Sequence, residues 1–265
     1  MPKNPPRGKK TATKSKTAKK ETSYPVPALD RGLDVLEILA AARRPLLLSE
    51  VAAEMGLASG VMFRLLTRLE SRQYLTRDPA TSRFSLSLRL YALALAQNPL
   101  DHLLRAARLP MEELAIAAGE SCHLSILLGQ DILVVASTAT PAPIHLTVEV
   151  GSRHQAAQTT SGRLLAALRP REEWAKLAPG VPGATLESLL KNGHASASNE
   201  RLIGVHDLAV PVRLADGHAA LAVPHLSSSR TKDDSARRLA LLQSASAQIS
   251  AAMGLPATPP TPAHA

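Results

Sequence analysis

The apolar residues between positions 28 and 71 repeat at helical spacing and predict three helices. Each apolar stripe is the side on which a helix is expected to pack against a core. The stripe of the first helix consists of Leu29, Leu33, Leu36, Leu39 and Ala40, and that of the third consists of Met62, Leu65, Leu66 and Leu69. The shorter second helix is predicted over residues 48–56.

A tight turn joins the second and third predicted helices. Ser49 is the expected N-cap of the second helix, because its hydroxyl can accept a hydrogen bond from a free amide of the first turn. Glu50 places negative charge at the positive end of that helix, and Gly56 suits the left-handed turn that ends it. This arrangement is typical of a helix-turn-helix, whose second helix enters the major groove of DNA.

A predicted hairpin follows the third helix. Residues 71–77 lead from a loop into a short strand, residues 78–82 carry turn chemistry, and residues 83–86 alternate polar and apolar side chains. A hairpin directly after a recognition helix is a wing. We therefore predict a winged helix-turn-helix domain over residues 24–86.

A linker helix is predicted over residues 87–100. Its apolar residues are Leu86, Leu88, Leu90, Tyr91, Leu93 and Leu95, and Pro99 is expected to end it. This apolar content exceeds what an isolated linker needs. We therefore expect the helix to form a dimer interface.

The second half of the chain alternates strand and helix patterns. The predicted strands are 124–128, 132–137, 145–150, 208–213 and 219–223, and the predicted helices are 103–118, 161–168 and 235–253. Hairpins with segregated helices indicate an α+β fold for this second domain, over residues 101–254.

The formal net charge of +9 belongs largely to one end of the chain. Residues 1–22 hold eight basic groups against Glu21, which gives +7 and leaves +2 for the rest. We expect residues 1–23 to be a disordered basic tail, either a nonspecific arm that follows DNA phosphates or a solubilising extension. The proline-rich residues 255–265 are expected to be a second disordered tail.

The composition also limits where the protein acts. No apolar run is long enough to span a bilayer, and no apolar segment that would indicate a signal peptide follows the N-terminus. The single cysteine, Cys122, excludes an internal disulfide and suits a reducing compartment. We expect a cytoplasmic, nucleoid-associated protein without membrane partners. We expect Cys122 to be a half-buried packing residue rather than a nucleophile.

Several segments in a fixed order resemble the IclR family of bacterial transcriptional regulators. They are residues 28–36, 48–57, 64–66, 69–70, 78–79 with 83–86, 119–124, 150–153, 160–166 and 208–212. The resemblance implies a dimer or tetramer with an N-terminal winged helix, a linker helix and a C-terminal effector-sensing domain of GAF-like fold. It also implies double-stranded DNA with a palindromic operator as a partner.

Candidate DNA contacts lie on the recognition helix and beside the wing. They are Ser49, Ser59, Phe63, Arg64, Thr67, Arg68 and Arg83. Arginine suits bidentate contacts to phosphate or guanine. Arg64 has the alternative of pairing with an acid of the neighbouring helix, and Phe63 of packing against the wing instead of touching a thymine methyl group.

Candidate effector contacts follow from the resemblance, which places the pocket at one helix start and along the late strands. The matching positions are Thr160, Ser161, Ser198 (or Ala197), Asp207, Ala222 and Pro224. Such walls favour a neutral or cationic, partly apolar molecule, for example a small aromatic. The alternative for Thr160 and Ser161 is plain helix capping.

Other function classes lack their motifs. No phosphate-binding glycine loop, paired Cys-x-x-Cys or His-Glu-x-x-His is present, and neither a catalytic residue, a metal site nor a cofactor is predicted. Three hypotheses remain: a ligand-responsive DNA-binding regulator, a DNA-binding regulator whose second domain only assembles the oligomer, and, ranked last, a small-molecule-binding enzyme with a vestigial winged helix.

Overall fold

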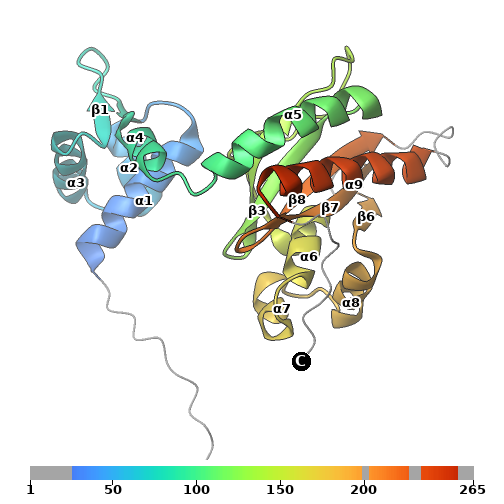
Figure 1. Cartoon of the computed structure of the whole chain (residues 1–265). Helices are drawn as coiled ribbons and strands as arrows, with labels where there is room; N and C mark the ends of the chain where they lie inside the picture. Colours follow the sequence, from blue (N-terminus) through green and yellow to red (C-terminus); the bar gives the residue numbers. More distant parts are fainter. Residues whose placement is uncertain (1–25, 199–202, 227–233, 256–265) are drawn as a thin grey trace, which may run out of the picture. The chain divides into compact units, whose positions relative to one another are not determined.

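The computed structural model describes residues 26–198, 203–226 and 234–255. The predicted tail over residues 1–23 lies outside these ranges, as does the tail predicted over residues 255–265 except for Leu255. The chain divides into two compact units, residues 1–98 and residues 99–265 (Figure 1). Helix and sheet are mixed, as the α+β class predicts.

The first unit is a winged helix. Its elements are α1 (Pro27–Ala42), α2 (Leu48–Met55), α3 (Ser59–Ser71), β1 (Leu75–Arg77), β2 (Phe84–Leu86) and α4 (Arg89–Ala96). The strands β1 and β2 pair antiparallel and form the predicted wing. Gly56 ends α2 with φ 62°, the left-handed conformation expected of it.

The first-helix stripe was only partly right: Leu39 is buried and Leu36 packs against the core, but Leu29, Leu33 and Ala40 lie outside it. Val35 and Leu39 are the buried residues, whereas Leu29 and Leu33 are 58% and 50% exposed and Ala40 is exposed. The core of this unit lies against only the C-terminal half of α1, where Val35 and Leu39 meet α2, α3 and the wing. The apolar residues of the N-terminal half therefore have no core to contact within the unit.

Two local predictions at helix starts were also wrong. Ser49 is the second residue of α2 and not its N-cap, since the helix begins at Leu48 and the backbone of Leu47 occupies the cap position. Glu50 serves the helix start instead by accepting a hydrogen bond from Leu47 N at 2.6 Å. The linker helix begins at Arg89, because Leu86 belongs to the wing, where it pairs with Leu75.

The second unit is built on a six-stranded sheet of order β5-β4-β3-β8-β7-β6. Its elements are α5 (Asp101–Ala118), β3 (Cys122–Leu128), β4 (Asp131–Thr138), β5 (Arg153–Gln155), the 3-10 helix η1 (Ala156–Gln158), α6 (Thr160–Ala167), α7 (Arg171–Leu177), α8 (Gly183–Asn192), β6 (Ala195–Ser198), β7 (Val205–Leu214), β8 (Gly217–Leu226) and α9 (Asp234–Ala252). All its strand pairs are antiparallel.

Helices cover both faces of this sheet (Figure 1). One face, which carries Leu124, Leu208 and Leu221, forms the main core with α5 and α9. The alternate residues, among them Ala209 and Ala222, point to the opposite face and pack against α6. The predicted effector positions Ala222 and Pro224 therefore belong to the face that α6 covers.

The strand predicted over residues 145–150 does not form. Its alternation places Leu146 and Val148 half-buried, but the edge of β4 is already paired by β5. Residues 149–152 make a turn instead, in which Ser152 N donates to the Glu149 carbonyl at 3.2 Å. The alternation thus reflects a loop with one side against the unit.

Candidate functional site

The outer side of α3 presents the predicted DNA-contacting residues to solvent. Two fully buried residues, Met62 and Leu66, anchor the opposite side of this helix in the core. The exposed set comprises Ser59, Phe63, Arg64, Thr67 and Arg68. Among the described residues, neither Arg64 nor Arg68 forms an ion pair with a carboxylate. Both guanidinium groups are therefore available to a partner outside the unit.

Phe63 is 52% exposed, so the structure leaves its ring at the surface of α3. An exposed aromatic ring among cationic and hydroxyl side chains suits contact with the apolar edge of a base, because the thymine methyl group projects into the major groove. The polar members of the set suit phosphates and base edges. This side of α3 thus combines both kinds of contact.

Glu50 connects the start of α2 to the wing. Its carboxylate accepts from Arg44 Nη1 at 2.9 Å and from Arg83 Nη1 at 2.8 Å. Arg83 donates additionally to the Pro45 carbonyl at 3.2 Å. The hydrogen bond from the Leu47 backbone and the nearby guanidinium groups hold the pKa of Glu50 below its ordinary value.

Arg83 is therefore already engaged within the unit. The prediction treated it as a free DNA contact, and no sequence signal indicated a partner 33 positions away. Its contacts tie the base of the wing to the segment before α2. Arg83 thus holds the wing against this segment, whereas Arg68 makes no ion pair among the described residues.

The turn of the wing is held by Asp78. Its carboxylate accepts from Ala80 N at 2.8 Å and from the Thr81 hydroxyl at 2.7 Å, and these bonds lower the pKa of Asp78. On β1, the Arg77 guanidinium lies over the Phe84 ring. The wing is consequently a preformed structure rather than a flexible loop.

The predicted effector residues at the start of α6 are buried. Thr159 is the N-cap and accepts from Gly162 N at 3.0 Å, while Thr160 and Ser161 are 7% and 3% exposed. A side chain at position 162 would meet the backbone of Ala156 at 2.4 Å. Only glycine therefore lets the first turn of α6 approach η1 this closely.

The predicted residues on the late strands lie in adjacent register positions. Asp207 of β7 is opposite Pro224 of β8 and, on its other side, opposite Ala197 of β6. Ser198 is exposed, with its hydroxyl 3.3 Å from His206 Nδ1. Ala222 is buried in the apolar cluster under α6. The strands thus bring Asp207 and Pro224 together, and α6 covers Ala222.

Two family models match the chain. The IclR helix-turn-helix domain matches residues 28–79, and the C-terminal domain of the bacterial transcriptional regulator IclR matches residues 99–251. The chain belongs to the IclR family. The resemblance seen in the sequence is thereby confirmed.

The glycerol operon regulatory protein of Streptomyces griseus is 33% identical to this IclR-family chain over 147 residues. The match spans 55% of this chain and 57% of that relative, a little more than half of each. This relative is one of fifteen curated proteins that match, and those named as regulators come from several bacteria.

Solved structures of the family share the fold. An IclR transcriptional regulator from Alicyclobacillus acidocaldarius superposes with a TM-score of 0.71 at 22% identity, over 87% of this chain and all of that one. An IclR homolog from Microbacterium hydrocarbonoxydans, complexed with 4-hydroxybenzoate, gives 0.73 at 20% identity, over 86% and 99%. At these identities the similarity establishes the predicted fold class.

Two polar residues that the sequence analysis missed lie on the α6 side of this IclR-family sheet. His123 and Ser125 of β3 are opposite Ala222 and Ala220 of β8, and both are buried. Neither His123 Nδ1 nor Ser125 Oγ has a hydrogen-bond partner among the described residues. Burial and the nearby His154 lower the pKa of His123 to about 4, so the ring is neutral near pH 7.

The sequence held a signal for these residues. They alternate with Leu124 and Ile126, so a strand there places them on the face opposite the main core. Cys122 packs in that core, where its sulfur lies 3.4 Å from the Met111 carbonyl and burial raises the pKa of its thiol to about 12. Its chemistry is that of a packing residue.

The described ranges hold neither a membrane-spanning helix nor a cluster of metal ligands. Within them, no helix combines the length and hydropathy that a membrane span requires. Nor do three or more potential metal ligands gather anywhere in the part of the chain that the structure describes.

Proposed function

We propose that this IclR-family chain is a transcriptional regulator that binds duplex DNA through α3 and the wing and responds to a small molecule bound by its second unit. The observation that carries the proposal is the exposed side of α3. Arg64, Arg68 and Phe63 are exposed there, the two arginines form no ion pair among the described residues, and the opposite side of the helix is buried in the core. A helix so presented, followed by a preformed wing, suits insertion into a major groove. The curated relatives named as regulators support it.

Self-association is part of the proposal. The apolar residues of α4 have no core to pack against within the first unit, and Leu88, Tyr91, Leu93 and Leu95 are 49% to 81% exposed. Leu29 and Leu33 of α1 add further exposed apolar surface in the same unit. Since monomeric proteins rarely leave this much apolar surface in water, we infer that a second copy covers it. A dimer, or a tetramer made of two dimers, matches a palindromic operator.

The effector site is proposed beside the start of α6. Thr160 and Ser161 supply buried hydroxyl groups there, and the unpartnered Nδ1 of His123 and Oγ of Ser125 lie on the sheet face that α6 covers. Their surroundings are otherwise leucine and alanine. This chemistry suits a neutral, partly apolar molecule with one or two hydrogen-bonding groups. The 4-hydroxybenzoate bound by the Microbacterium homolog is also a small aromatic molecule, but it carries a carboxylate that the neutral ligand proposed here lacks.

This role has two further consequences, for where the protein acts and for whether it is an enzyme. A protein that binds chromosomal DNA acts in the cytoplasm, at the nucleoid. The proposed response requires only that the ligand bind differently to two arrangements of the oligomer, so it needs no catalytic turnover. We therefore propose a regulator that is not an enzyme.

Selection of bound sequences from random duplexes with the full chain tests the DNA part. We expect enrichment of a palindrome, with affinity that falls steeply as salt rises because counterions are released from the phosphates. Arg68→Ala should weaken binding about tenfold. The matched control is Arg105→Ala on α5, an exposed arginine paired with Asp101 on the same helix.

Absence of any sequence preference would refute the proposal. The sensing part is tested separately, by titrating small aromatic and hydroxylated compounds into the complex with the selected duplex. A compound that changes DNA affinity in the wild type and not in Thr160→Val supports sensing at α6. DNA binding that no compound alters would indicate that the second unit serves only for assembly.

A further inference from the structure

A cluster of contacts joins the end of α3 to the start of α4 in the first unit. Gln73 and Tyr74 follow α3, Ser87 precedes α4, and Arg89 is the first residue of α4. The Ser87 amide donates to the Tyr74 carbonyl at 2.9 Å, and the Ser87 hydroxyl donates to the Gln73 carbonyl. The same hydroxyl accepts from the Arg89 amide at 3.1 Å. Ser87 therefore connects the two helices through its backbone and through its side chain.

The side chain of Arg89 makes two further contacts in this cluster. Its guanidinium carbon lies 5.3 Å from the centre of the Tyr74 ring, and its Nη1 donates to the side-chain oxygen of Gln73 at 3.4 Å. A guanidinium group at that distance over an aromatic ring is attracted to the ring. Both contacts join the same two helices as those of Ser87. We call Gln73, Tyr74, Ser87 and Arg89 the α3–α4 junction.

Gln73 occupies a position that suits glycine better. Its φ is 63°, in the left-handed region, and its amide donates to the Glu70 carbonyl at 2.8 Å as α3 ends. Glycine is the usual residue at such a helix end, because a side chain is strained there. A glycine would, however, lack the amide oxygen that accepts from Arg89. The strained conformation of Gln73 thus coincides with a side-chain contact to α4, which points to a use for this residue in the junction.

The rest of α4 is not anchored in the first unit. The structure describes the whole of α4, and none of its residues is buried. The buried core of the unit contains residues of α1, α2, α3 and the wing, but none of α4. The direction in which α4 leaves the unit therefore depends on the α3–α4 junction.

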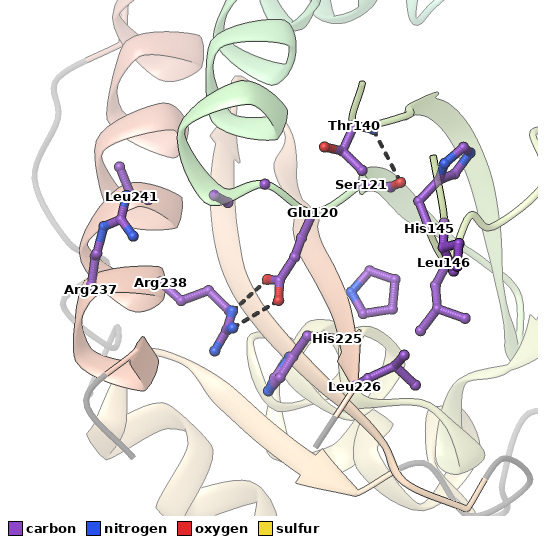
Figure 2. A pocket seen from close by; sticks show the side chains of 14 residues that line it. Glu120, Ser121, Thr140, His145, Leu146, His225, Leu226, Arg237, Arg238 and Leu241 are labelled. Atoms are coloured by element: carbon purple, nitrogen blue, oxygen red, sulfur yellow. Dashed lines mark hydrogen bonds and ion pairs between the residues drawn. The ribbon is translucent and has the colours of Figure 1, made fainter. Parts of the chain in front are cut away.

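The helix α9 of the second unit shows the more usual way of fixing a helix. Leu242, Ala245 and Ile249 pack it into the main core of that unit. Near its start, Arg238 donates from Nε and Nη2 to the two carboxylate oxygens of Glu120, at 2.5 and 2.8 Å (Figure 2). The direction of α9 is thus set along its length, whereas that of α4 is set at one end.

We propose that the α3–α4 junction sets the distance and orientation between the two α3 helices of a dimer. This inference rests on the proposed function, in which the apolar residues of α4 pair two copies and α3 enters the major groove. The angle between α4 and α3 then determines where each α3 meets the DNA, and hence how many base pairs separate the two half-sites. The four residues of the junction are positioning residues, which select the spacing of half-sites that the dimer accepts.

Binding to duplexes with different spacers tests the proposal. Each duplex carries the half-site selected by the wild type as an inverted repeat, and each base pair added between the halves rotates one of them by about a tenth of a helical turn. We expect the wild type to prefer one spacing about tenfold over its neighbours, and Arg89→Ala to reduce this preference to about threefold or less. Affinity for a duplex with a single half-site should not change, because the outer side of α3 is intact.

Arg77→Ala is the matched control. The Arg77 guanidinium lies 5.5 Å from the centre of the Phe84 ring and donates to the Ser82 hydroxyl at 3.1 Å. The substitution therefore removes the same kinds of contact from within the wing, without involving α4. The spacing preference should remain that of the wild type, even where affinity falls at every spacing.

A measurement without DNA tests the junction directly. Spin labels attached through Thr67→Cys on α3 and Ala96→Cys on α4 report the distance between the two helices, when labelled chains are diluted with unlabelled ones. The native Cys122 is buried and does not compete for the label. We expect Arg89→Ala to broaden the distribution of this distance, and Arg77→Ala to leave it unchanged.

Three results would overturn the proposal alone: a distance distribution that Arg89→Ala does not broaden, a spacing preference that Arg89→Ala leaves sharp, or an equal loss of affinity at every spacing and at the single half-site. The last result would indicate that Arg89 contacts DNA itself. A wild type without preference for any palindrome would refute the proposed function, and this inference with it.

Discussion

The two units of this chain hold their functional polar groups in opposite ways. On α3 the arginines and hydroxyl groups are exposed to solvent, and the opposite side of the helix contributes Met62 and Leu66 to a small core. In the second unit the comparable groups, such as His123 and Ser125, are buried between helices and sheet. A polyanion is bound by charge at a surface, where desolvation is limited. A small molecule makes few contacts. Its binding site must therefore exclude water and keep some hydrogen-bond donors without protein partners, so that they can bind the ligand.

If the two units fold independently, a substitution that destabilises one should leave the stability of the other unchanged. Gly162→Ala is the strongest test of this independence. The added methyl group would meet the Ala156 backbone at 2.4 Å. We expect the second unit to lose about 3 kcal/mol of stability, as overpacked sites do. Urea unfolding followed by fluorescence of Trp174 reports on this unit alone, because Trp174 is the single tryptophan of the chain.

Gly60→Ala is the matched control for this prediction. A side chain at position 60 meets nothing within 4 Å on the surface of α3. We expect the Trp174 transition to stay unchanged, while α3 gains roughly 1 kcal/mol of helix propensity. If Gly162→Ala also weakened DNA binding at temperatures where the first unit is folded, the two units would not be independent of each other.

A charge on α4 tests whether the exposed apolar surface of the first unit is an interface. Leu93→Glu should dissociate the oligomer and lower the affinity for a palindromic duplex up to about 100-fold. The reason is that the winged-helix units of two copies would then bind their half-sites separately instead of as one linked pair. Analytical ultracentrifugation measures the assembly. The same change at Leu128, 45% exposed in the second unit, is the control. A wild-type chain that sediments as a monomer would contradict the prediction.

The buried histidine of the second unit should make its stability depend on pH. The pKa of His123 is lowered to about 4 in the folded unit. Between that pKa and the ordinary histidine pKa of about 6.5, the His123 ring is therefore protonated in the unfolded chain and neutral in the folded unit. The stability is therefore full above about pH 6.5 and is lost as pH falls toward 4. We expect a loss on the order of 1–2 kcal/mol between pH 7 and pH 5 in the Trp174 transition.

His123→Gln should flatten this dependence, whereas His145→Gln, at an exposed position, should not. Part of the dependence of stability on pH should persist in His123→Gln, because burial also lowers the pKa of His218 and of His225. An unaltered slope in His123→Gln would show that its ring is not protected from protons as the structure indicates.

The smallest effect is expected at the base of the wing. Arg83→Ala removes the contacts with Glu50 and the Pro45 carbonyl but no free DNA-binding group, so DNA affinity should fall about threefold, as for loss of an exposed ion pair. Glu50→Gln should produce a similar loss, because it weakens the same contact from the other side. A loss as large as that of Arg68→Ala would instead make Arg83 a direct contact.

Sequence patterns predicted the winged helix and most of the sheet because their information is local. Periodicity located α3, the turn chemistry of residues 78–82 located the wing, and the helix predicted over residues 103–118 ends where α5 does. The stripe on α1 was right for Leu36 and Leu39 and wrong for Leu29 and Leu33, because its periodicity continues beyond the core that the helix contacts. The strand over 145–150 failed because alternation cannot tell whether a neighbouring edge is free.

The candidate sites depended more on contacts between distant residues. The free side of α3 followed from helical spacing alone. The engagement of Arg83 by Glu50 and of Arg238 by Glu120 joins residues 33 and 118 positions apart, which no local pattern reveals. Unpartnered atoms such as His123 Nδ1 are visible only once every neighbour is placed.

The order of the strands has a consequence for how the protein is made. The centre of the sheet pairs β3 with β8, so that Ser125 lies opposite Ala220. During synthesis the first unit has all its elements once α4 has emerged, whereas β3 must wait for almost the whole chain before its central partner exists. Such long-range pairing is slow to form, and domains generally fold in the order in which they leave the ribosome. A chain cut short before β8 should therefore carry a folded DNA-binding head without a sensor to control it.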